Sequence, residues 1–292
     1  MAIEDALLDG KKNLWRDIFC TDIYKEIFLK RNLIQELILK ELKIRYSRPF
    51  LGFLWTFLSP FFIVIIFYVI FSLFLKVKIE EAPFLLYLMT AVFPWRFFQD
   101  SITASTTSLV DNKNLIRESN FPHYLIPISI SMSNFINFLP SLVILIITSL
   151  LISKGLPVFI LFLPLILLIH LLIVIGLSII FSVLYVKWRD IKYILEPLLL
   201  MLFYLIPGFY SLRLVKDSLP PPLFDVYTYN PLVGLLSLYR ISVLKGFYSK
   251  MAWDIKISTL IFITLSFAII IFLLGAYVYK KNRYKINDYL SY

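Results

Sequence analysis

The chain has 292 residues, of which 60% are hydrophobic and only 16% carry a formal charge. A soluble domain has about 45–50% apolar and about 25% charged residues, so this composition excludes an ordinary soluble domain and a disordered chain. The single cysteine, Cys20, excludes a disulfide scaffold, and the net charge of +10 has to be explained by where the basic residues lie. The composition therefore predicts an all-α, polytopic membrane protein.

The first predicted element is an amphipathic helix in a cytoplasmic N-terminal tail, residues 1–48. Over residues 26–46, apolar side chains recur at helical spacing on one face, and charged side chains fill much of the remainder. This pattern is typical of a helix lying in the membrane interface. A soluble helix packed against a partner is the alternative. The tail shows no apolar segment or small-residue cleavage site of a signal peptide.

The remainder, residues 49–292, is predicted to form a single transmembrane domain with six spans. Each predicted span is a long run with few or no charges, and most exceed the roughly 20 residues that cross the hydrocarbon core as a helix. The spans are expected at about 50–75, 82–110, 124–153, 157–186, 193–212 and 257–279. The second contains Arg96 and Asp100, and the fifth contains Glu196.

The distribution of basic residues predicts that both termini face the cytoplasm. With the N-terminus inside, 19 of the 29 Lys and Arg residues fall in inner segments, 9 in outer segments and one within a span. Such an excess on one side fixes the orientation of a membrane protein. The charge of +10 is therefore interpreted as an orientation signal, and we expect no nucleic-acid partner.

The outer segment at residues 227–249 is predicted to form one or two short helices between spans five and six. Asn230 followed by Pro231 is a helix-start pattern, and the apolar residues behind it, including Leu235, accompany Tyr239 and Arg240. The segment is too short and too charged for a clean span. We expect it to dip into the outer leaflet as a gate; interfacial packing without a gating role is the alternative.

The sequence contains no pattern of a catalytic, nucleotide-binding or metal site. The eight glycines form no Walker loop or dinucleotide fingerprint, and His123 and His170 lie far apart. We therefore expect neither enzymatic activity nor a cofactor or metal bound by this chain. Arg96 and Asp100 are four residues apart and can pair on one helical face. An ionisable pair within a span marks either a pathway or bundle stabilisation, and both interpretations stay open.

Aromatic residues, 17% of the chain, are dense in the first, second and fifth spans. Interfacial belts explain some of them, and bundle packing or the wall of a pathway would explain rings at mid-span. Flat aromatic faces suit a sliding sugar chain, because the apolar faces of sugars stack on them. The candidate conduit-lining residues are Trp55, Phe62, Tyr87, Trp95, Arg96, Asp100 and Tyr204.

Four motifs, in order, resemble the membrane permeases of ABC exporters for O-antigen, capsular and teichoic-acid polymers. The first comprises Arg45-Tyr46, Leu51-Gly52, Trp55 and Pro60. The second comprises Asn114-Leu115-Ile116, Phe121-Pro122, Ile126-Pro127 and Ser129. The third and fourth are Arg189-Asp190-Ile191 and Asn230-Pro231. The chain departs from the family pattern at His123-Tyr124, where Arg-Glu is usual, and at Arg48-Pro49-Phe50 before Leu51-Gly52.

The resemblance implies a permease that moves a lipid-linked or lipid-capped polysaccharide across the bacterial inner membrane. It implies partners as well: a second copy of the chain, two separate ATP-binding cassette subunits that bind ATP and Mg²⁺, and membrane lipid. The first, second and fifth spans would line a conduit at the dimer axis, and loop 111–123 would be the helix that couples to the ATPase. The implied coupling residues are Asp111, Asn112, Lys113, Asn114, Leu115, Ile116, Arg117, Glu118, Phe121 and Pro122.

Three other functions remain as alternatives. The chain could be a related ABC exporter of a small drug or lipid. It could be a membrane-embedded transferase acting on a lipid-linked sugar, for which only Glu196, Asp100 and His170 are candidate catalytic groups. A passive channel is the third, and the resemblance at the coupling loop argues against it.

Overall fold

A computed structural model describes residues 30–46, 55–77, 79–116, 121–251 and 253–291 of the chain. Within these ranges the regular secondary structure is helical and no strand occurs. The expected all-α fold is therefore confirmed. The candidate residues Arg117 and Glu118 lie outside the described residues, and so does the side chain of Trp55.

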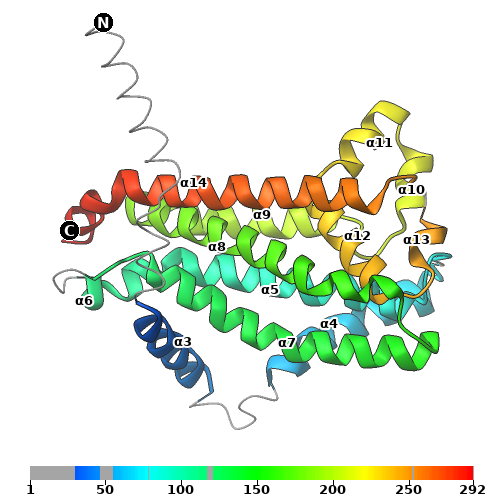
Figure 1. Ribbon diagram of the computed structural model, residues 1–292, viewed down its shortest axis with the longest axis horizontal. Helices are drawn as coiled ribbons and strands as arrows, with labels where there is room; N and C mark the ends of the chain where they lie inside the picture. Colours follow the sequence, from blue (N-terminus) through cyan, green and yellow to red (C-terminus); the bar gives the residue numbers. More distant parts are fainter. Residues whose placement is uncertain (1–29, 47–54, 78, 117–120, 252, 292) are drawn as a thin grey trace, which may run out of the picture.

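Five long helices run along the long axis of the molecule (Figure 1). They are α5 (Phe84–Asp111), α7 (Leu125–Ser153), α8 (Leu163–Lys187), α9 (Ile191–Leu205) and α14 (Ile257–Ser291). A short 3₁₀ helix, η3 (Val158–Phe162), leads into α8. Among the described residues, three helical segments are long and apolar enough to cross a membrane, namely Leu125–Ser153, Val158–Lys187 and Ile257–Ile286.

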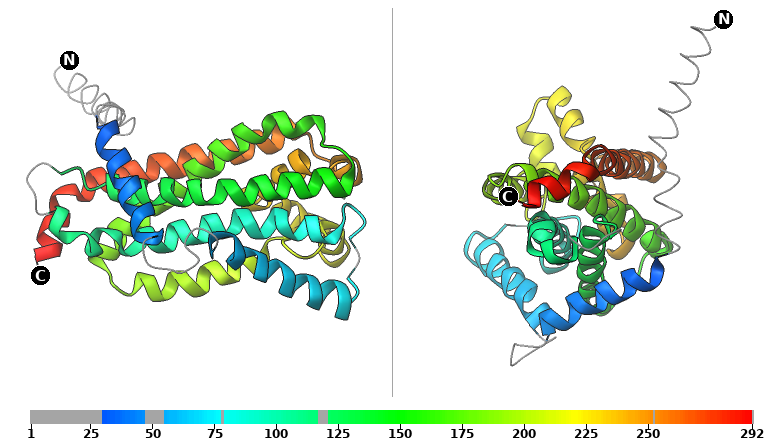
Figure 2. Two further views of the ribbon diagram at one scale, coloured as in Figure 1. Left: turned by 90° about the horizontal axis from the view of Figure 1, so that it is seen from below. Right: turned by 90° about the vertical axis from the view of Figure 1, so that its left-hand side faces the viewer.

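The first predicted span is a shorter apolar helix that changes its winding. Helix α4 (Trp55–Phe67) contains Pro60 and continues as the π-helix η2 (Tyr68–Phe74). Both α4 and α9 pack against α5, and they lie on the same side of it (Figure 2, left). The predicted fifth span, 193–212, is helical only as far as Leu205, because the residue before a proline avoids the helical conformation and Pro207 follows Ile206.

Helices α8 and α14 approach each other closely through two glycines. A Cβ atom added to Gly176 would lie 2.7 Å from the carbonyl oxygen of Ile271, and one added to Gly275 would lie 2.7 Å from the carbonyl oxygen of Gly176. Small residues at a helix interface let the two backbones come together, which is a common way of packing helices in membranes. This contact joins the two most apolar of the long segments.

One end of the bundle, called here the α6 end, carries α3 (Arg31–Tyr46), α6 (Lys113–Ile116) and the C-terminal part of α14 (Figure 1). Helix α3 packs on α7 and runs steeply across the long helices (Figure 2, left). Leu37, Ile116 and Ile286 belong to one buried apolar cluster. A helix is thus present over the described part of the predicted 26–46 segment, and its Leu37 belongs to the same apolar cluster as residues of α6 and α14.

The opposite end, called here the α12 end, carries four short helices (Figure 1). They are α10 (Leu212–Ser218), α11 (Pro221–Thr228), α12 (Pro231–Val243) and α13 (Phe247–Lys250). Asn230 caps α12 as its pattern predicts, since its Oδ1 accepts a hydrogen bond of 2.9 Å from the Leu232 amide. Helix α12 is buried over Val233–Val243 and packs against α5, α8 and α14. It is an internal element of the bundle.

Candidate functional site

An ionic pair lies at the middle of α5. The guanidinium of Arg96 is 3.6 Å from the carboxylate of Asp100, as their spacing predicts, and the side chains are 33% and 42% exposed. Arg96 also donates a hydrogen bond of 3.4 Å to the hydroxyl of Ser59 on α4. In a membrane protein, a charged pair on a helix is costly where it faces lipid. We therefore expect this side of α5 to meet water or protein.

Aromatic side chains connect α4 with α9 and the turn that follows it. The ring of Phe67 stacks on Phe203 and on Phe209, with centroids 5.9 Å and 5.8 Å apart. Phe62 and Tyr204, both predicted to line the conduit, are 48% exposed. The two helices that pack on α5 therefore each carry a partly exposed aromatic ring.

Two other candidates for the conduit lining lie inside the bundle. Trp95 is buried, packs against Phe98 and Phe203 with centroids 5.1 Å and 5.6 Å away, and donates a hydrogen bond of 3.2 Å to Gln99. Tyr87 is also buried. In this structure both side chains pack the core behind the aromatic surface.

Tyr87 belongs to a buried network centred on Arg240 of α12, which is 0% exposed. Arg240 donates hydrogen bonds to the Tyr87 hydroxyl at 2.9 Å and to the carbonyl oxygens of Pro207 and Gly208 at 2.5 Å and 3.2 Å. The Tyr87 hydroxyl in turn donates to the carbonyl oxygen of Tyr210 at 2.9 Å. One arginine thus joins α12, α5 and the turn after α9.

The remaining gate candidates divide between the start and the interior of α12. Asn230 is exposed and Pro231 half-buried, whereas Leu235 is buried. Tyr239 is buried too, and its hydroxyl lies 3.0 Å from Nδ1 of His170 on α8. The expected role for His170, a hydrogen-bonding group between helices, agrees with this contact.

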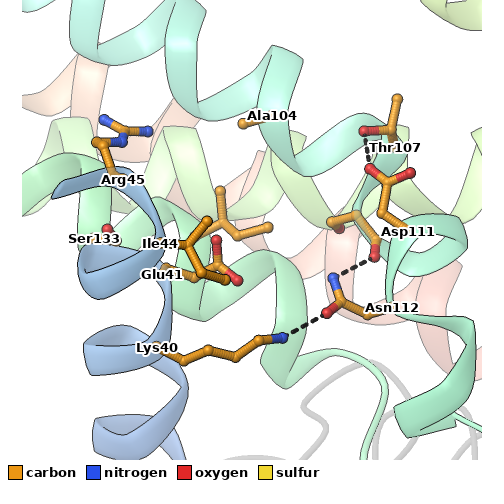
Figure 3. A pocket seen from close by; sticks show the side chains of 11 residues that line it. Lys40, Glu41, Ile44, Arg45, Ala104, Thr107, Asp111, Asn112 and Ser133 are labelled. Carbon is orange, nitrogen blue, oxygen red and sulfur yellow. Dashed lines mark hydrogen bonds between the residues drawn. The ribbon is translucent and has the colours of Figure 1, made fainter. Parts of the chain in front are cut away.

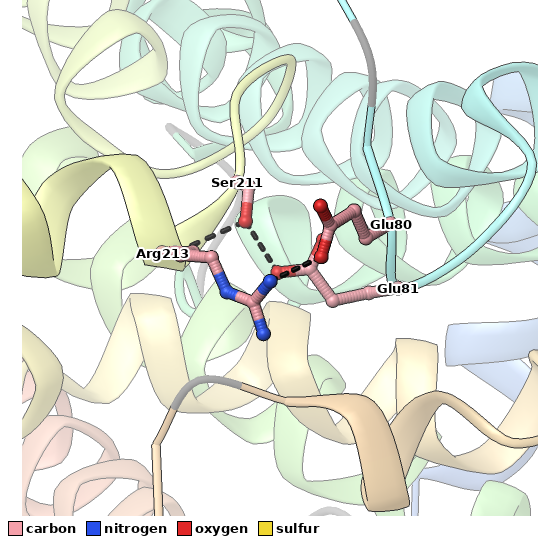
Figure 4. A network of polar contacts seen from close by, with 4 residues as sticks. All are labelled: Glu80, Glu81, Ser211 and Arg213. Atoms are coloured by element: carbon pink, nitrogen blue, oxygen red, sulfur yellow. Dashed lines mark hydrogen bonds and ion pairs between the residues drawn. The ribbon is translucent and has the colours of Figure 1, made fainter.

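A second polar network, with buried and exposed members, lies at the α12 end and is called here the surface network (Figure 4). Ser211 donates a hydrogen bond to Glu81, and Arg213 is paired with Glu80. The amide of Arg213 donates to the Ser211 hydroxyl at 3.0 Å, which caps α10. These contacts attach the start of α10 to the segment before α5.

The predicted coupling segment begins where α5 ends. The side chain of Asn112 donates to the carbonyl oxygen of Ser108 at 2.9 Å and accepts a hydrogen bond of 2.8 Å from Lys40 of α3. Asp111 accepts a hydrogen bond of 2.6 Å from Thr107. Helix α6 follows at once, and its Ile116 is buried. The coupling segment is thereby tied to α3 as well as to α5.

The other described coupling candidates differ in exposure. Lys113 and Asn114 are exposed, Leu115 and Phe121 are half-buried, and Pro122 is buried. The exposed pair lies at the tip of the α6 end, where a partner can reach it. Burial lowers the pKa of His123, which follows Pro122.

The all-helical bundle with several apolar helices defines a multi-pass membrane protein. The chain belongs to the ABC-2 type transporter family, whose sequence pattern matches residues 32–244. It is 28% identical over 218 residues to the O-antigen export system permease protein RfbA of Myxococcus xanthus, covering 75% of this chain and 82% of that protein. It is 28% identical over 254 residues to the RfbA permease of Klebsiella pneumoniae, covering 86% and 92%. These relatives confirm the resemblance predicted from the four motifs.

Proposed function

We propose that the chain is the permease subunit of an ATP-driven exporter that moves a lipid-linked or lipid-capped polysaccharide of the O-antigen type. The observation that carries the proposal is the Arg96–Asp100 pair, half exposed at the middle of α5, on the side of the bundle that α4 and α9 cover. The exposed rings of Phe62 and Tyr204 supply faces on which sugars stack. The two RfbA relatives are named for O-antigen export, which supports the same substrate class.

The proposed topology has six spans in the bacterial inner membrane. They are α4 with η2, α5, α7, η3 with α8, α9 with the turn that follows it, and α14. The α6 end then faces the cytoplasm. The excess of Lys and Arg in the predicted inner segments supports this orientation. Helix α3 lies along the cytoplasmic membrane surface, and the α12 end closes the bundle at the outer surface.

In the proposed assembly two copies of the chain face each other through α4, α5 and α9. The two copies enclose the conduit, so that the Arg96–Asp100 pair meets water or the polymer and not lipid. Two ATP-binding subunits, which bind ATP and Mg²⁺, contact α6 through Lys113 and Asn114. When they close, α6 moves together with α3, because Lys40 is bonded to Asn112. Because packed helices shift as rigid units, this movement then opens the conduit or advances the polymer through it in steps.

The test is export in vesicles that contain this chain, its ATPase partner and a fluorescent lipid-linked polysaccharide. We expect ATP-dependent movement of the polymer, and we expect Tyr204→Leu to lower its rate several-fold at unchanged ATP turnover, because a stacking face is lost. Phe262→Leu is the matched control, since Phe262 is 70% exposed on α14, away from the proposed conduit.

Two results would contradict this function. ATP turnover without polymer movement would exclude polysaccharide export. Transport of small hydrophobic compounds with the polymer left untouched would identify a drug or lipid exporter instead.

A further inference from the structure

A cavity of about 380 Å³ lies at the α6 end, between α3, α5 and α7 (Figure 3). Its volume falls in the range of small-molecule sites. Helix α3 contributes Lys40, Glu41, Ile44 and Arg45, α5 and the residue after it contribute Ala104, Thr107, Ser108, Asp111 and Asn112, and α7 contributes Ile130 and Ser133. Most of the residues that line the cavity are therefore polar or charged, although they lie on helices of a membrane protein.

Several polar side chains around the cavity make no hydrogen bond within the part of the chain that the structure describes. Neither Glu41 nor Arg45 makes a hydrogen bond or ion pair with a residue that the structure describes. The Ser133 side chain is 1% exposed, and its hydroxyl makes no hydrogen bond. A buried hydroxyl without a partner is unfavourable. Burial raises the pKa of Glu41, and the nearby charges of Lys40 and Arg45 act against that rise. Arg45 is exposed and Glu41 half-buried, so both are open to a polar ligand, and Ser133 offers it a buried hydroxyl.

The charges around the cavity balance. Lys40 and Arg45 are basic, and Glu41 and Asp111 are acidic. A lone anion would leave two carboxylates facing it, and a lone cation would meet two basic groups. A ligand that carries a phosphate and an ammonium group a few bonds apart can pair with both the basic and the acidic residues.

The surroundings of the cavity suit a lipid. Leu39 and Ile44 on α3 are 47% and 58% exposed, so apolar surface flanks the charged groups. On the proposed topology, on which this step rests, α3 lies at the cytoplasmic membrane surface, where headgroups of the inner leaflet are at the same depth. An acyl chain can then follow α3 while the headgroup enters the cavity.

We propose that this cavity binds the headgroup of a zwitterionic aminophospholipid from the inner leaflet. Its phosphate lies against Lys40 and Arg45, and its ammonium group lies against Glu41 and Asp111. A bound lipid joins α3 to α5 and α7 at the point where Lys40 already contacts Asn112. It thereby stabilises the connection between α3 and the coupling segment.

The proposal is tested by native mass spectrometry of the full chain, purified in detergent and titrated with phosphatidylethanolamine or phosphatidylglycerol. We expect a saturable phosphatidylethanolamine adduct, and we expect Glu41→Gln and Arg45→Gln each to weaken it about tenfold through loss of a charge-assisted contact. Glu36→Gln and Lys43→Gln are matched controls, because both residues are exposed on α3 and neither lines the cavity. Both controls should bind as the unchanged chain does.

A third variant blocks the cavity by its size and leaves the charges around it unchanged. Ala104→Leu fills the cavity from α5 and should abolish the adduct, and circular dichroism establishes that each variant is folded. Retention of the adduct by Ala104→Leu, equal binding of phosphatidylglycerol, or unchanged binding by Glu41→Gln and Arg45→Gln would overturn the proposal. If the charge variants do not fold, two measurements decide the proposal: binding by Ala104→Leu, and the preference of the unchanged chain for phosphatidylethanolamine over phosphatidylglycerol. Because no ATPase or polymer is present, the result is independent of the transport assay.

Discussion

The polar side chains at the two ends of the bundle differ in their hydrogen bonding. At the α12 end, Arg240 is fully buried and bonded to a hydroxyl and two carbonyl oxygens. At the α6 end, Glu41, Arg45 and Ser133 line a cavity, and their side chains make no hydrogen bond with any residue that the structure describes. Buried networks with good geometry make a structure rigid, whereas polar groups left open are available to ligands and partners.

This difference agrees with what each end does in the proposed exporter. The coupling segment has to respond to a partner that moves. Among the described residues, the side-chain hydrogen bond from Lys40 and a shared apolar cluster join it to α3. At the α12 end, Arg240 bonds to α5 and to the turn after α9, and α12 itself is buried against three long helices. We infer that the α12 end keeps its internal packing while the α6 end moves.

The largest effect is expected from Arg240→Met. The change removes three hydrogen bonds and leaves buried carbonyl groups unpaired, so the free energy of unfolding should fall by about 3 kcal/mol. The melting temperature of the purified chain in detergent measures this loss.

Lys250→Met is the control for Arg240→Met, since Lys250 is an exposed basic residue at the same end. It should leave the melting temperature unchanged. Equal melting temperatures for Arg240→Met and Lys250→Met would mean that the network does not stabilise the α12 end.

A smaller effect is expected at the α6 end, from a double-mutant cycle on Lys40 and Asn112. Their hydrogen bond of 2.8 Å is partly buried and charged, so Lys40→Met and Asn112→Leu should show a coupling energy of about 1–2 kcal/mol. Melting in lipid-free detergent measures the cycle. The control is the same cycle with Lys43→Met in place of Lys40→Met, which should show additive effects. If Lys40→Met and Asn112→Leu are also additive, this hydrogen bond does not link α3 to the coupling segment.

The structural features that depend on neighbouring residues could be predicted from the sequence. Apolar runs identified the long helices, the spacing of Arg96 and Asp100 indicated their pair, and Asn230 before Pro231 indicated a helix start. Each of these signals lies within a few residues of its structural outcome. The third, fourth and sixth predicted spans contain segments with the length and apolar composition needed to cross a membrane.

What the sequence did not predict depends on distant contacts. Arg240 looked like a break in an apolar stretch, yet it is buried because its partner Tyr87 is 153 residues away. Lys40 and Asn112 are 72 residues apart, and their bond has no local signal. The cavity is formed by three helices that are separate in sequence, so no motif could indicate it. An arginine within an apolar run was the available clue to the Arg240 network.

The smallest effect is expected from Arg213→Gln, also at the α12 end. Arg213 and Glu80 form an ion pair with side chains 51% and 73% exposed, and exposed pairs contribute less than about 1 kcal/mol and weaken in salt. The melting temperature of Arg213→Gln should therefore stay close to that of the unchanged chain and coincide with it in high salt. Glu80→Gln should have the same small effect on the melting temperature.

A fall in melting temperature as large as that of Arg240→Met would mean that the surface network, and not the buried one, holds the α12 end together. The contrast between two arginines of one end thus separates the effect of burial from that of charge.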